Sequence, residues 1–587
     1  MALARRCWPL LVLALGALLP MARVLAGPRS LLVGTELSDV YKHAWAFWHV
    51  TETLGWPRTT ALNHPDGGLF LDMMWAPALL MLPVTAVGGA VLSANLWMWL
   101  SLWLVGACTW WLARELVGDG AGALLGGLAA QTATPLLGYP MLSGVHERLG
   151  VWVFPLVVLM LLRIRDRGGI WEVAVAAGGL GFVALGCQAY GLYAGGLLLM
   201  GLPLWLGHPR DWLPRLKRLA PVGLALLLVM GAVYAVSYTL TTDPESLVPQ
   251  PGRLGEGPKL ILDAATVGGL LDPRVAASVQ PTLGGDELYV LTYLGWMGLG
   301  LALVGAALAR GGRRWDVRGL TALALLMALQ SLGPHFQVGA QHFVNPLFVA
   351  MAAVIPHYGS NPPVWQNVLA VAPLLAPGIA AAIERAPRGS WALAGLAWVA
   401  IVAERAATLP VAFPLPVTAA EVAEPYAAIV EEGAVAEVPR IYRDLTTAHG
   451  SLFISQTAHE RPVPHTINIG ASPWDSYAPL ARGVARDWGE AAACLNGAGY
   501  RYLVVHRDHF SGQSAAAEAI DGLSRAASVV ADDGVVAVFD LGPVPGETTH
   551  AGPALSRSSM ELVQQGLAGR PLRVGDLRPD WTRCPAR

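Results

Sequence analysis

Charged residues are scarce in this sequence. Only 14% of its 587 residues are Asp, Glu, Lys or Arg, against about 25% in a typical soluble domain. Hydrophobic residues make up 54%, and the mean hydropathy is +0.48. These values exclude a soluble enzyme, a disordered scaffold and a disulfide-rich secreted module. The net charge of −2 and the lack of a long basic run make nucleic acid an unsuitable partner. The chain is expected to cross a membrane many times.

Cysteine is rare as well. The five cysteines form no CxxC pair and show no metal-ligand spacing, so neither a disulfide framework nor a zinc site is expected. The C-terminal part has no glycine-rich phosphate loop and no G-x-S-x-G motif.

Apolar segments dominate the first two thirds of the chain. A spanning helix needs about 20 mainly apolar residues, and about eleven segments qualify (range 10 to 13). They are 7–26, 70–88, 91–113, 150–164, 171–189, 191–207, 219–240, 289–309, 317–333, 365–383 and 391–407. After about residue 408 no apolar run is long enough to span. We therefore expect a transmembrane domain over 1–407 and a soluble domain over 408–587, large enough for its own core.

Arginine placement predicts the orientation. Arg5 and Arg6 precede the first apolar run, which favours a cytoplasmic N-terminus. Later basic clusters, within 163–218 and 310–388, all reach the cytoplasm only if two apolar stretches do not cross. These stretches, 120–137 and 345–356, are expected to be interfacial or re-entrant. The orientation then places the soluble domain outside the cytoplasm, together with the loops 27–69, 114–149, 241–288 and 334–364.

The first segment has an alternative interpretation. Residues 1–27 have the charged start, apolar middle and small-residue end of a cleavable signal peptide. The length of the apolar run and the position of Arg23, just before the cleavage site that this reading implies, favour a retained span instead.

The soluble domain has the pattern of an α/β fold. Short β-rich runs alternate with helical periodicity. The expected strands are Pro439–Tyr442, Leu452–Ser455, Tyr500–His506 and Val535–Asp540, and the expected helices cover 418–432, 476–495 and 514–527. Its clustered histidines, His459, His465, His506 and His509, are interpreted as polar loop residues because their spacing is not specific for a metal.

The first outer loop contains the sequence GTELSDVYKHAWAFWHV. Asp39 and His43 are four residues apart and share one face of a helix, with Trp45 and Trp48 along its edge. Ionisable groups at a membrane interface commonly face solvent or headgroups, and this alternative applies to Glu52 and His64 in particular. An acid inside an amphipathic aromatic segment has less reason to be there, so Asp39 is the stronger functional candidate.

The second outer loop brings His146, Glu147 and Arg148 directly before an apolar run. Such a triplet can simply anchor a helix end, but the orientation puts Glu147 on the same membrane face as Asp39. Two acids there suit glycosyl transfer from a lipid phosphate: one deprotonates an acceptor hydroxyl, and the other positions the acceptor or holds a divalent cation, Mg²⁺ or Mn²⁺. Cations or hydrogen-bond donors must stabilise the departing phosphate. The candidates for this role are Lys42, His43, Arg148 and His357.

The order of these motifs resembles a known family. A first span is followed by an acidic loop (Glu36 to Asp39), a PDGG turn, a Pro-rich second span, the SGVHE loop, many further spans and an extracytoplasmic α/β domain. The whole chain resembles the GT-C superfamily of polytopic glycosyltransferases, which includes protein O-mannosyltransferases and the lipid A aminoarabinose transferase. Within it the chain is most similar to uncharacterised bacterial members. The resemblance implies that Asp39 is the catalytic base and Glu147 the second acid.

Two departures from the family pattern stand out. Many members have adjacent acids in the first loop, whereas Leu37 and Ser38 separate Glu36 from Asp39 here. The stretch after the short re-entrant helix often contains arginines in related sequences but reads IPHYGSNPPVW here, which leaves His357 and Tyr358 as weak substitutes. Further substrate-binding candidates are Glu36, His146, Gln188 and Tyr190; for the last two, aromatic packing at the membrane interface is the alternative.

The sequence therefore predicts a bacterial inner-membrane glycosyltransferase. It would move a sugar from a polyprenyl-phosphate donor to a glycan, lipid or protein acceptor on the extracytoplasmic side. The alternative is a non-catalytic lipid or polysaccharide transporter or an envelope assembly factor, and a glycan sensor is a third class. Transporters tend to place ionisable residues within spans and to show internal repeats. Neither feature is seen here, which favours the enzyme.

Overall fold

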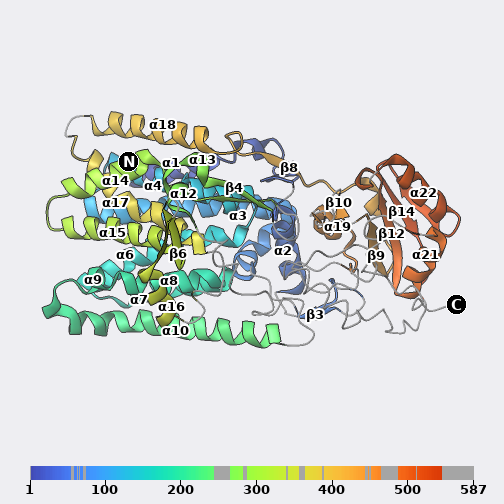
Figure 1. The fold of residues 1–587 in the computed structure, drawn as a ribbon, viewed down its shortest axis with the longest axis horizontal. Helices are drawn as coiled ribbons and strands as arrows, with labels where there is room; N and C mark the ends of the chain where they lie inside the picture. The colour runs from blue at the N-terminus through green and yellow to red at the C-terminus, as the bar shows by residue number, and fades with distance from the viewer. Residues whose placement is uncertain are drawn as a thin grey trace.

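The computed structural model is mainly helical over the described part of the first 408 residues, and a small mixed sheet follows (Figure 1). The structure describes residues 2–36, 38–54, 58–62, 64, 67–69, 74–242, 265–281, 287–338, 341–355, 358, 364–386, 389–439, 441–442, 447–448, 451–464, 485, 487–510 and 512–544.

The helical part is a bundle of roughly parallel and antiparallel helices (Figure 1). Its main helices are α1 (Ala2–Leu18), α2 (Val40–Thr53), α3 (Trp75–Val117), α4 (Ala121–Gln131), α6 (Val153–Asp166), α7 (Ile170–Gly186), α8 (Gln188–Met200), α10 (Trp212–Thr242), α14 (Trp296–Leu308), α15 (Arg314–Gln330), α17 (Val371–Ile383) and α18 (Ser390–Thr408). Shorter helical elements are η1 (Ala22–Ala26), α5 (Thr134–Leu136), η2 (Leu137–Leu142), η3 (His146–Trp152), α9 (Leu202–Leu206), η4 (Pro209–Asp211), α12 (Val267–Leu271), α13 (Pro273–Ala276), α16 (Pro346–Val354) and η5 (Val364–Ala370).

Antiparallel strand pairs lie between these helices. They are β1 (Leu31–Val33) with β8 (Val417–Ala419), β2 (Arg58–Thr59) with β3 (Gly68–Leu69), β4 (Ala277–Pro281) with β5 (Glu287–Leu291), and β6 (His335–Val338) with β7 (Gln341–Val344).

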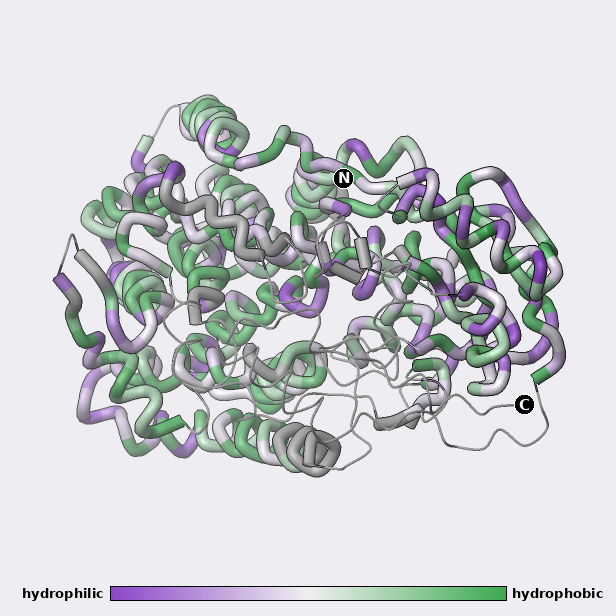
Figure 2. Tube along the Cα trace, turned by 45° about the vertical axis from the view of Figure 1, so that its right-hand side comes forward, coloured by the Kyte–Doolittle hydropathy of each residue, from purple (hydrophilic) through white to green (hydrophobic). Residues whose placement is uncertain are grey.

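The bundle has the surface of a membrane protein. By length and apolar composition α3 and α18 qualify as membrane spans, and five shorter apolar helices accompany them. Figure 2 shows hydrophobic residues along the bundle helices and more hydrophilic ones at helix ends and in the C-terminal part. Exposed tryptophans also stand where helices begin beside arginine clusters: Trp171, Trp212, Trp315 and Trp391 are 72%, 44%, 64% and 54% exposed. Tryptophan at this position is typical of a membrane–water interface.

Two predicted segments can be compared directly with the structure. Gly89 has a non-helical φ of 83°, so α3 consists of two helices, which match the predicted segments 70–88 and 91–113. The bend is sharp, because Thr85 Oγ1 lies 2.9 Å from Ser93 Oγ, eight residues on. The stretch 120–137, expected to be re-entrant, contains the fully buried helix α4.

The start of the predicted outer loop 114–149 is also placed differently. Glu115 pairs with Arg163 and Arg167, and the backbone N–H of Gly122 donates to Glu384 (2.9 Å). The segment therefore lies beside the arginine clusters assigned to the cytoplasmic side, away from Glu147. The prediction was wrong for this part of the loop because α4 takes the chain across the bundle before Glu147 is reached.

Small residues explain why α4 is buried. A Cβ added to Gly122 would lie 2.5 Å from the Ala380 carbonyl oxygen, and one on Gly127 would lie 2.6 Å from that of Gly106. The backbones of α4, α17 and α3 therefore approach too closely for a larger side chain, as in packed membrane helices. The Gly/Ala composition that suggested a re-entrant segment indicates close helix packing instead.

Helix α1 is tied into the bundle by side chains of its neighbours. Trp103 Nε1 donates to the Leu10 carbonyl (3.0 Å), Trp99 Nε1 to Ala14 (3.1 Å) and Gln131 Nε2 to Leu13 (3.2 Å). Cleavage after residue 26 would remove all three acceptors, which favours a retained helix.

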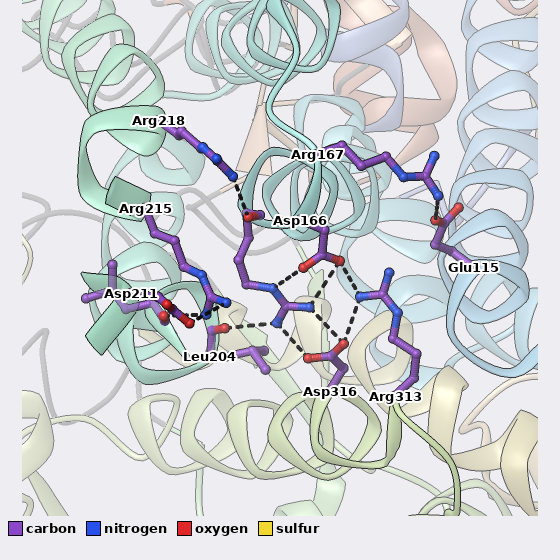
Figure 3. A network of polar contacts seen from close by, with 11 residues as sticks. Glu115, Asp166, Arg167, Leu204, Asp211, Arg215, Arg218, Arg313 and Asp316 are labelled. Carbon is purple, nitrogen blue, oxygen red and sulfur yellow. Dashed lines mark hydrogen bonds and ion pairs between the residues drawn. The ribbon is translucent and has the colours of Figure 1, made fainter. Parts of the chain in front are cut away.

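An ion-pair network connects helix ends on the arginine-rich side of the bundle (Figure 3). Arg165 donates to both carboxylate oxygens of Asp316 (2.6 and 2.9 Å) and to Asp166 (2.7 Å). Arg313 completes the group with contacts to Asp166 and Asp316. These pairs join α6 to α15 at one face of the membrane domain.

The C-terminal part is an α/β unit. Its sheet has the order β13 (Ser528–Asp532), β14 (Val536–Asp540), β12 (Tyr500–His506), β9 (Ala434–Val438); the β12–β9 pair is parallel and the others antiparallel. Around it lie η6 (Glu424–Ala428), the pair β10 (Ile441–Tyr442) and β11 (Thr447–Ala448), α19 (Ser451–His459), α21 (Trp488–Gly497), η8 (Arg507–His509) and α22 (Gln513–Ser524). Residues of β9, β12, β14, α21 and α22 form a separate buried core.

Several sequence expectations for this unit are met and others are wrong. The strand at Tyr500–His506 and the helix near 514–527 form where predicted. Leu452–Ser455 lies in α19 rather than a strand, and the predicted helix 418–432 is replaced by the end of β8 and η6. Cys494 is disulfide-bonded, which the cysteine spacing did not predict.

Candidate functional site

The first outer loop forms a helix that begins at the strongest sequence candidate. Asp39 is the N-cap residue of α2, and its carboxylate accepts from Lys42 Nζ at 2.6 Å instead of capping the helix. The helix is held from both sides. Tyr41 OH donates to the Ala419 carbonyl (2.8 Å), and Trp45 Nε1 donates to Gln456 Oε1 (2.8 Å). The C-terminal unit therefore fixes the position of the helix that carries Asp39.

The second outer loop packs directly on the first turn of α2. Gly144 has a φ of +63°, and a Cβ there would lie 2.4 Å from the Cα of Val40, so only glycine fits. The Thr35 backbone N–H donates to the Leu142 carbonyl (3.1 Å), and Trp97 Nε1 donates to the His146 carbonyl (3.2 Å). These contacts place the HER triplet of η3 against the start of α2.

His43 connects the two acidic loops. Its Nε2 lies 3.2 Å from Glu147 Oε2, and it follows Asp39 by one helical turn, with its backbone N–H donating to the Asp39 carbonyl. The His43 and His146 rings are 5.8 Å apart. The structure thus brings Asp39 and Glu147 into one buried cluster, as the sequence predicted.

Arg148 supplies a buried cation next to Glu147. Its Nε lies 3.5 Å from Glu147 Oε1, and its Nη1 donates to Cys187 Sγ at 2.6 Å. The Tyr190 hydroxyl donates to the Arg148 carbonyl oxygen, which fixes the backbone there. Only 7% of Arg148 is exposed, so its charge is felt strongly by any anion that enters the cluster.

Burial and neighbouring charges shift the pKa values of the two acids in opposite directions. Burial raises the pKa of Asp39, but the charge of Lys42 and its hydrogen bond to the carboxylate oppose burial, and the net pKa lies below its ordinary value. Burial raises the pKa of Glu147 above its ordinary value, although Arg148 and Lys42 oppose it. Asp39 is therefore ionised at neutral pH, whereas Glu147 takes up a proton more readily.

The two histidines stay neutral. Burial, reinforced by the Lys42 charge, lowers the pKa of His43 to about 3. Burial and His43 bring the pKa of His146 well below its ordinary value. At neutral pH the charges of the cluster are thus those of the acids, Lys42 and Arg148.

Several buried polar atoms in the cluster make no hydrogen bond within the described residues. They include Nδ1 and Nε2 of His146, and also Glu147 Oε2, whose contact with His43 lacks hydrogen-bond geometry. A buried polar group left in this state costs about 1–3 kcal/mol. A ligand with hydroxyl or phosphate groups would satisfy these atoms.

The remaining predicted site residues are placed less favourably. Glu36 is exposed and Gln188 is the first residue of α8, while His357 lies outside the described residues. Sequence reasoning missed Cys187, the partner of Arg148, and Trp97, which positions His146. Cys187 directly precedes Gln188, one of the predicted candidates, so the sequence indicated the segment but not this contact.

The acids of the cluster already have cationic partners in the chain, Lys42 for Asp39 and Arg148 for Glu147. Among the described residues, the group of His, Cys, Asp or Glu side chains close enough together to share a metal ion lies elsewhere, in the C-terminal unit.

Comparison with solved structures identifies the fold. The arabinofuranosyltransferase AftD from Mycobacteria has a TM-score of 0.58 to this chain at 16% identity, covering 92% of this chain and 40% of AftD. The Archaeoglobus fulgidus oligosaccharyltransferase AglB in complex with an inhibitory peptide and dolichol-phosphate (TM-score 0.45, 13% identity, 86% and 70% coverage) also matches. So does ArnT from Cupriavidus metallidurans bound to undecaprenyl phosphate (0.41, 16%, 92% and 99%). No protein-family model and no curated protein sequence matches the chain.

The likeness to AftD shows that the chain shares the fold of this arabinofuranosyltransferase, which agrees with the resemblance to GT-C glycosyltransferases in the order of its sequence motifs. The other two TM-scores are below 0.5, so the conclusion about the fold depends on AftD. The chain spans less than half the length of AftD.

Proposed function

We propose that this protein transfers a sugar from a polyprenyl-phosphate donor to an acceptor hydroxyl on the extracytoplasmic side of the membrane. One observation carries the proposal: acids from two separate outer loops, Asp39 and Glu147, meet in a buried cluster that also holds two cations and unsatisfied polar atoms. A shared fold alone does not establish an activity, so the argument depends on this cluster.

Asp39 is suited to be the general base. Its carboxylate is ionised at neutral pH, and Lys42 holds it in place at the helix N-terminus. In the proposed step Asp39 accepts the proton of the acceptor hydroxyl as that oxygen bonds to the anomeric carbon. The bond between this carbon and the phosphate oxygen breaks, its electron pair stays on the phosphate, and the configuration inverts.

Arg148 and Lys42 are suited to stabilise the departing phosphate. Both are cations within the cluster, and Arg148 is oriented by Cys187 and Glu147. A guanidinium offers several donors to phosphate oxygens. Charge stabilisation of this kind replaces the general acid that a sugar leaving group would need. Glu147, with its raised pKa, is suited to hydrogen-bond a sugar or acceptor hydroxyl.

The membrane orientation belongs to the same proposal. In the topology that we favour, α1, the second part of α3, α4, α6, α7, α8, α10, α14, α15, α17 and α18 cross the membrane, which again gives about eleven spans. The Arg165 network then lies at the cytoplasmic face, and the α2–η3 cluster at the outer face. The disulfide-bonded Cys494 agrees with an extracytoplasmic C-terminal unit, because such bonds persist in oxidising compartments.

The test is transfer by purified protein supplied with a panel of undecaprenyl-phosphate sugars, with release of undecaprenyl phosphate measured by mass spectrometry. We expect release with at least one donor and its loss in Asp39→Asn. A transporter or assembly factor would instead bind the lipid and release no phosphate product, and its function would tolerate Asp39→Asn.

A further inference from the structure

A group of metal-binding side chains lies at the end of the central strand of the C-terminal unit. Strand β12 ends at His506, and the single turn of η8 then brings Asp508 and His509 beside it. One ligand atom from each of the three residues lies within 4.8 Å of the others. The two imidazoles are buried and the carboxylate is exposed. The group is thus open to solvent on one side.

A buried carboxylate fixes the His506 ring. Its Nε2 lies 2.8 Å from Glu437 Oε2, on the neighbouring strand β9, and Glu437 is fully buried. The Tyr426 hydroxyl donates to the same Glu437 oxygen at 2.6 Å. With the Nε2 proton donated to Glu437, the lone pair of His506 is on Nδ1. A carboxylate that orients an imidazole in this way is the usual companion of a metal-binding histidine.

The two imidazole rings lie against each other, with the carboxylate beside them. The His506 and His509 rings are stacked, 4.6 Å apart and at 7° to each other, and His509 Nε2 lies 3.8 Å from Asp508 Oδ2. That separation is beyond hydrogen-bonding distance. The Asp508 carboxylate therefore lies beside the His509 ring without a close contact between Nε2 and Oδ2. A cation bound between the three side chains would connect them. One ring would have to tilt, because the nitrogens of two parallel rings point along parallel lines and cannot both point at one ion.

We propose that His506, Asp508 and His509 form a binding site for a divalent transition metal, for which Zn²⁺ is the best fit. Two imidazole nitrogens and one carboxylate oxygen are a donor set that zinc accepts, with a fourth position left for water or another ligand. Mg²⁺ and Ca²⁺ prefer oxygen ligands throughout. The H-x-x-H spacing alone did not indicate this site. The burial of both rings and the Glu437 contact are what the structure adds.

The site is independent of the proposed sugar transfer. The metal would connect the end of β12 to η8, close to the start of α22. The metal would stabilise this edge of the C-terminal unit. The same unit also holds helix α2, by means of its helix α19. The Asp39 cluster contributes no ligand to it.

The experiment is Zn²⁺ binding by the full-length protein, purified without a polyhistidine tag, stripped with a chelator and dialysed. Isothermal titration and metal analysis should show one Zn²⁺ per chain, with no binding of Mg²⁺ or Ca²⁺. Asp508→Asn and His509→Gln should abolish the site, and Glu437→Gln should weaken it about 10–100-fold. Because Asp508 is exposed, Asp508→Asn should not disturb folding. Zn²⁺ should raise the Tm of the wild type but not of this variant.

His459→Gln is the matched control. His459 is buried in the same unit and stacks on Tyr426, but it does not belong to the metal-binding group. It should retain one Zn²⁺ per chain. Absence of stoichiometric Zn²⁺ in the wild type would overturn the proposal, as would unchanged binding in both Asp508→Asn and His509→Gln.

Discussion

Two clusters of arginines and acids lie at opposite ends of α6, and they differ in how completely their polar atoms are paired. At the end of α6, Arg165 bonds both oxygens of Asp316 and also Asp166, and Arg313 reaches the same two acids (Figure 3). Before its start, the ring nitrogens of His146 and one oxygen of Glu147 make no hydrogen bond within the described residues.

This difference in hydrogen-bond pairing distinguishes a structural network from a ligand-binding site. A paired network holds helices together and gains nothing from a ligand. A buried cluster with unsatisfied groups costs stability, and a ligand that bonds those groups would recover it. Of these two clusters, the one at the end of α6 therefore fits a structural role, and the one before its start fits binding and chemistry. The predictions below test this division.

The largest effect is expected at the first-loop acid. Asp39→Asn should keep folding and donor binding but lower turnover by about 10²–10⁴-fold, because the general base is removed. This corresponds to roughly 3–5 kcal/mol of barrier. The measurement is phosphate-lipid release by protein matched for folding. Glu52→Gln removes an exposed acid from the same helix and should leave turnover unchanged. Full activity in Asp39→Asn would remove Asp39 from the mechanism and favour the transporter alternative.

The next effect falls on stability rather than turnover. Asp316→Asn removes the more buried of the two acids that Arg165 and Arg313 share, and breaking a buried pair in this way costs about 3–5 kcal/mol. Thermal unfolding in detergent should show a clear fall in Tm. Asp211→Asn is the control, since its pair with Arg215 is half exposed and worth less than about 1 kcal/mol. If Asp316→Asn unfolds like the wild type, the network is not what joins α6 to α15.

A buried histidine on α2 provides a pH test of packing. His49 stacks on Trp45, and burial lowers its pKa from 6.5 to about 4. The unfolded chain therefore binds the His49 proton more tightly than the folded chain does. The contribution of neutral His49 to the free energy of unfolding is fully present above pH 6.5 and is lost as the pH decreases toward 4. The largest loss from this residue is about 3 kcal/mol. His49→Phe should keep the stacking and flatten this part of the Tm-versus-pH curve. An unchanged slope would assign the pH dependence to other groups.

The convergence of the two acids was predictable, and the burial of α4 was not. Basic clusters fix which loops share a face, and this logic placed Asp39 and Glu147 together. Hydropathy separated 70–88 from 91–113, and Gly89 divides α3 between these segments. It did not show that Gly122 and Gly127 bury α4 through backbone contact.

Most side-chain contacts within the site could not be predicted from the sequence. Lys42 and Asp39 are three residues apart, and their pairing on one helix face could be expected. The contact of Arg148 with Cys187 joins residues 39 apart and depends on how η3 packs against α7. In the C-terminal unit, Leu452–Ser455 was misassigned because a short apolar run fits a strand or a helix equally well.

The smallest effect concerns the second acid. In the structure Glu147 contacts His43 and Arg148, and its raised pKa suits hydrogen bonding to a substrate hydroxyl. Glu147→Gln keeps the size of the side chain, and its amide can still donate and accept hydrogen bonds. We therefore expect a loss of about tenfold in turnover, or about 1.4 kcal/mol, with little change in Tm.

If Glu147 instead holds an essential cation, the loss should equal that of Asp39→Asn. Wild-type turnover would then depend on Mg²⁺ or Mn²⁺ and fall with a chelator. Running both variants with and without Mn²⁺ separates the two roles. Because Arg148 already neutralises Glu147, the milder and metal-independent outcome is the one that the geometry predicts.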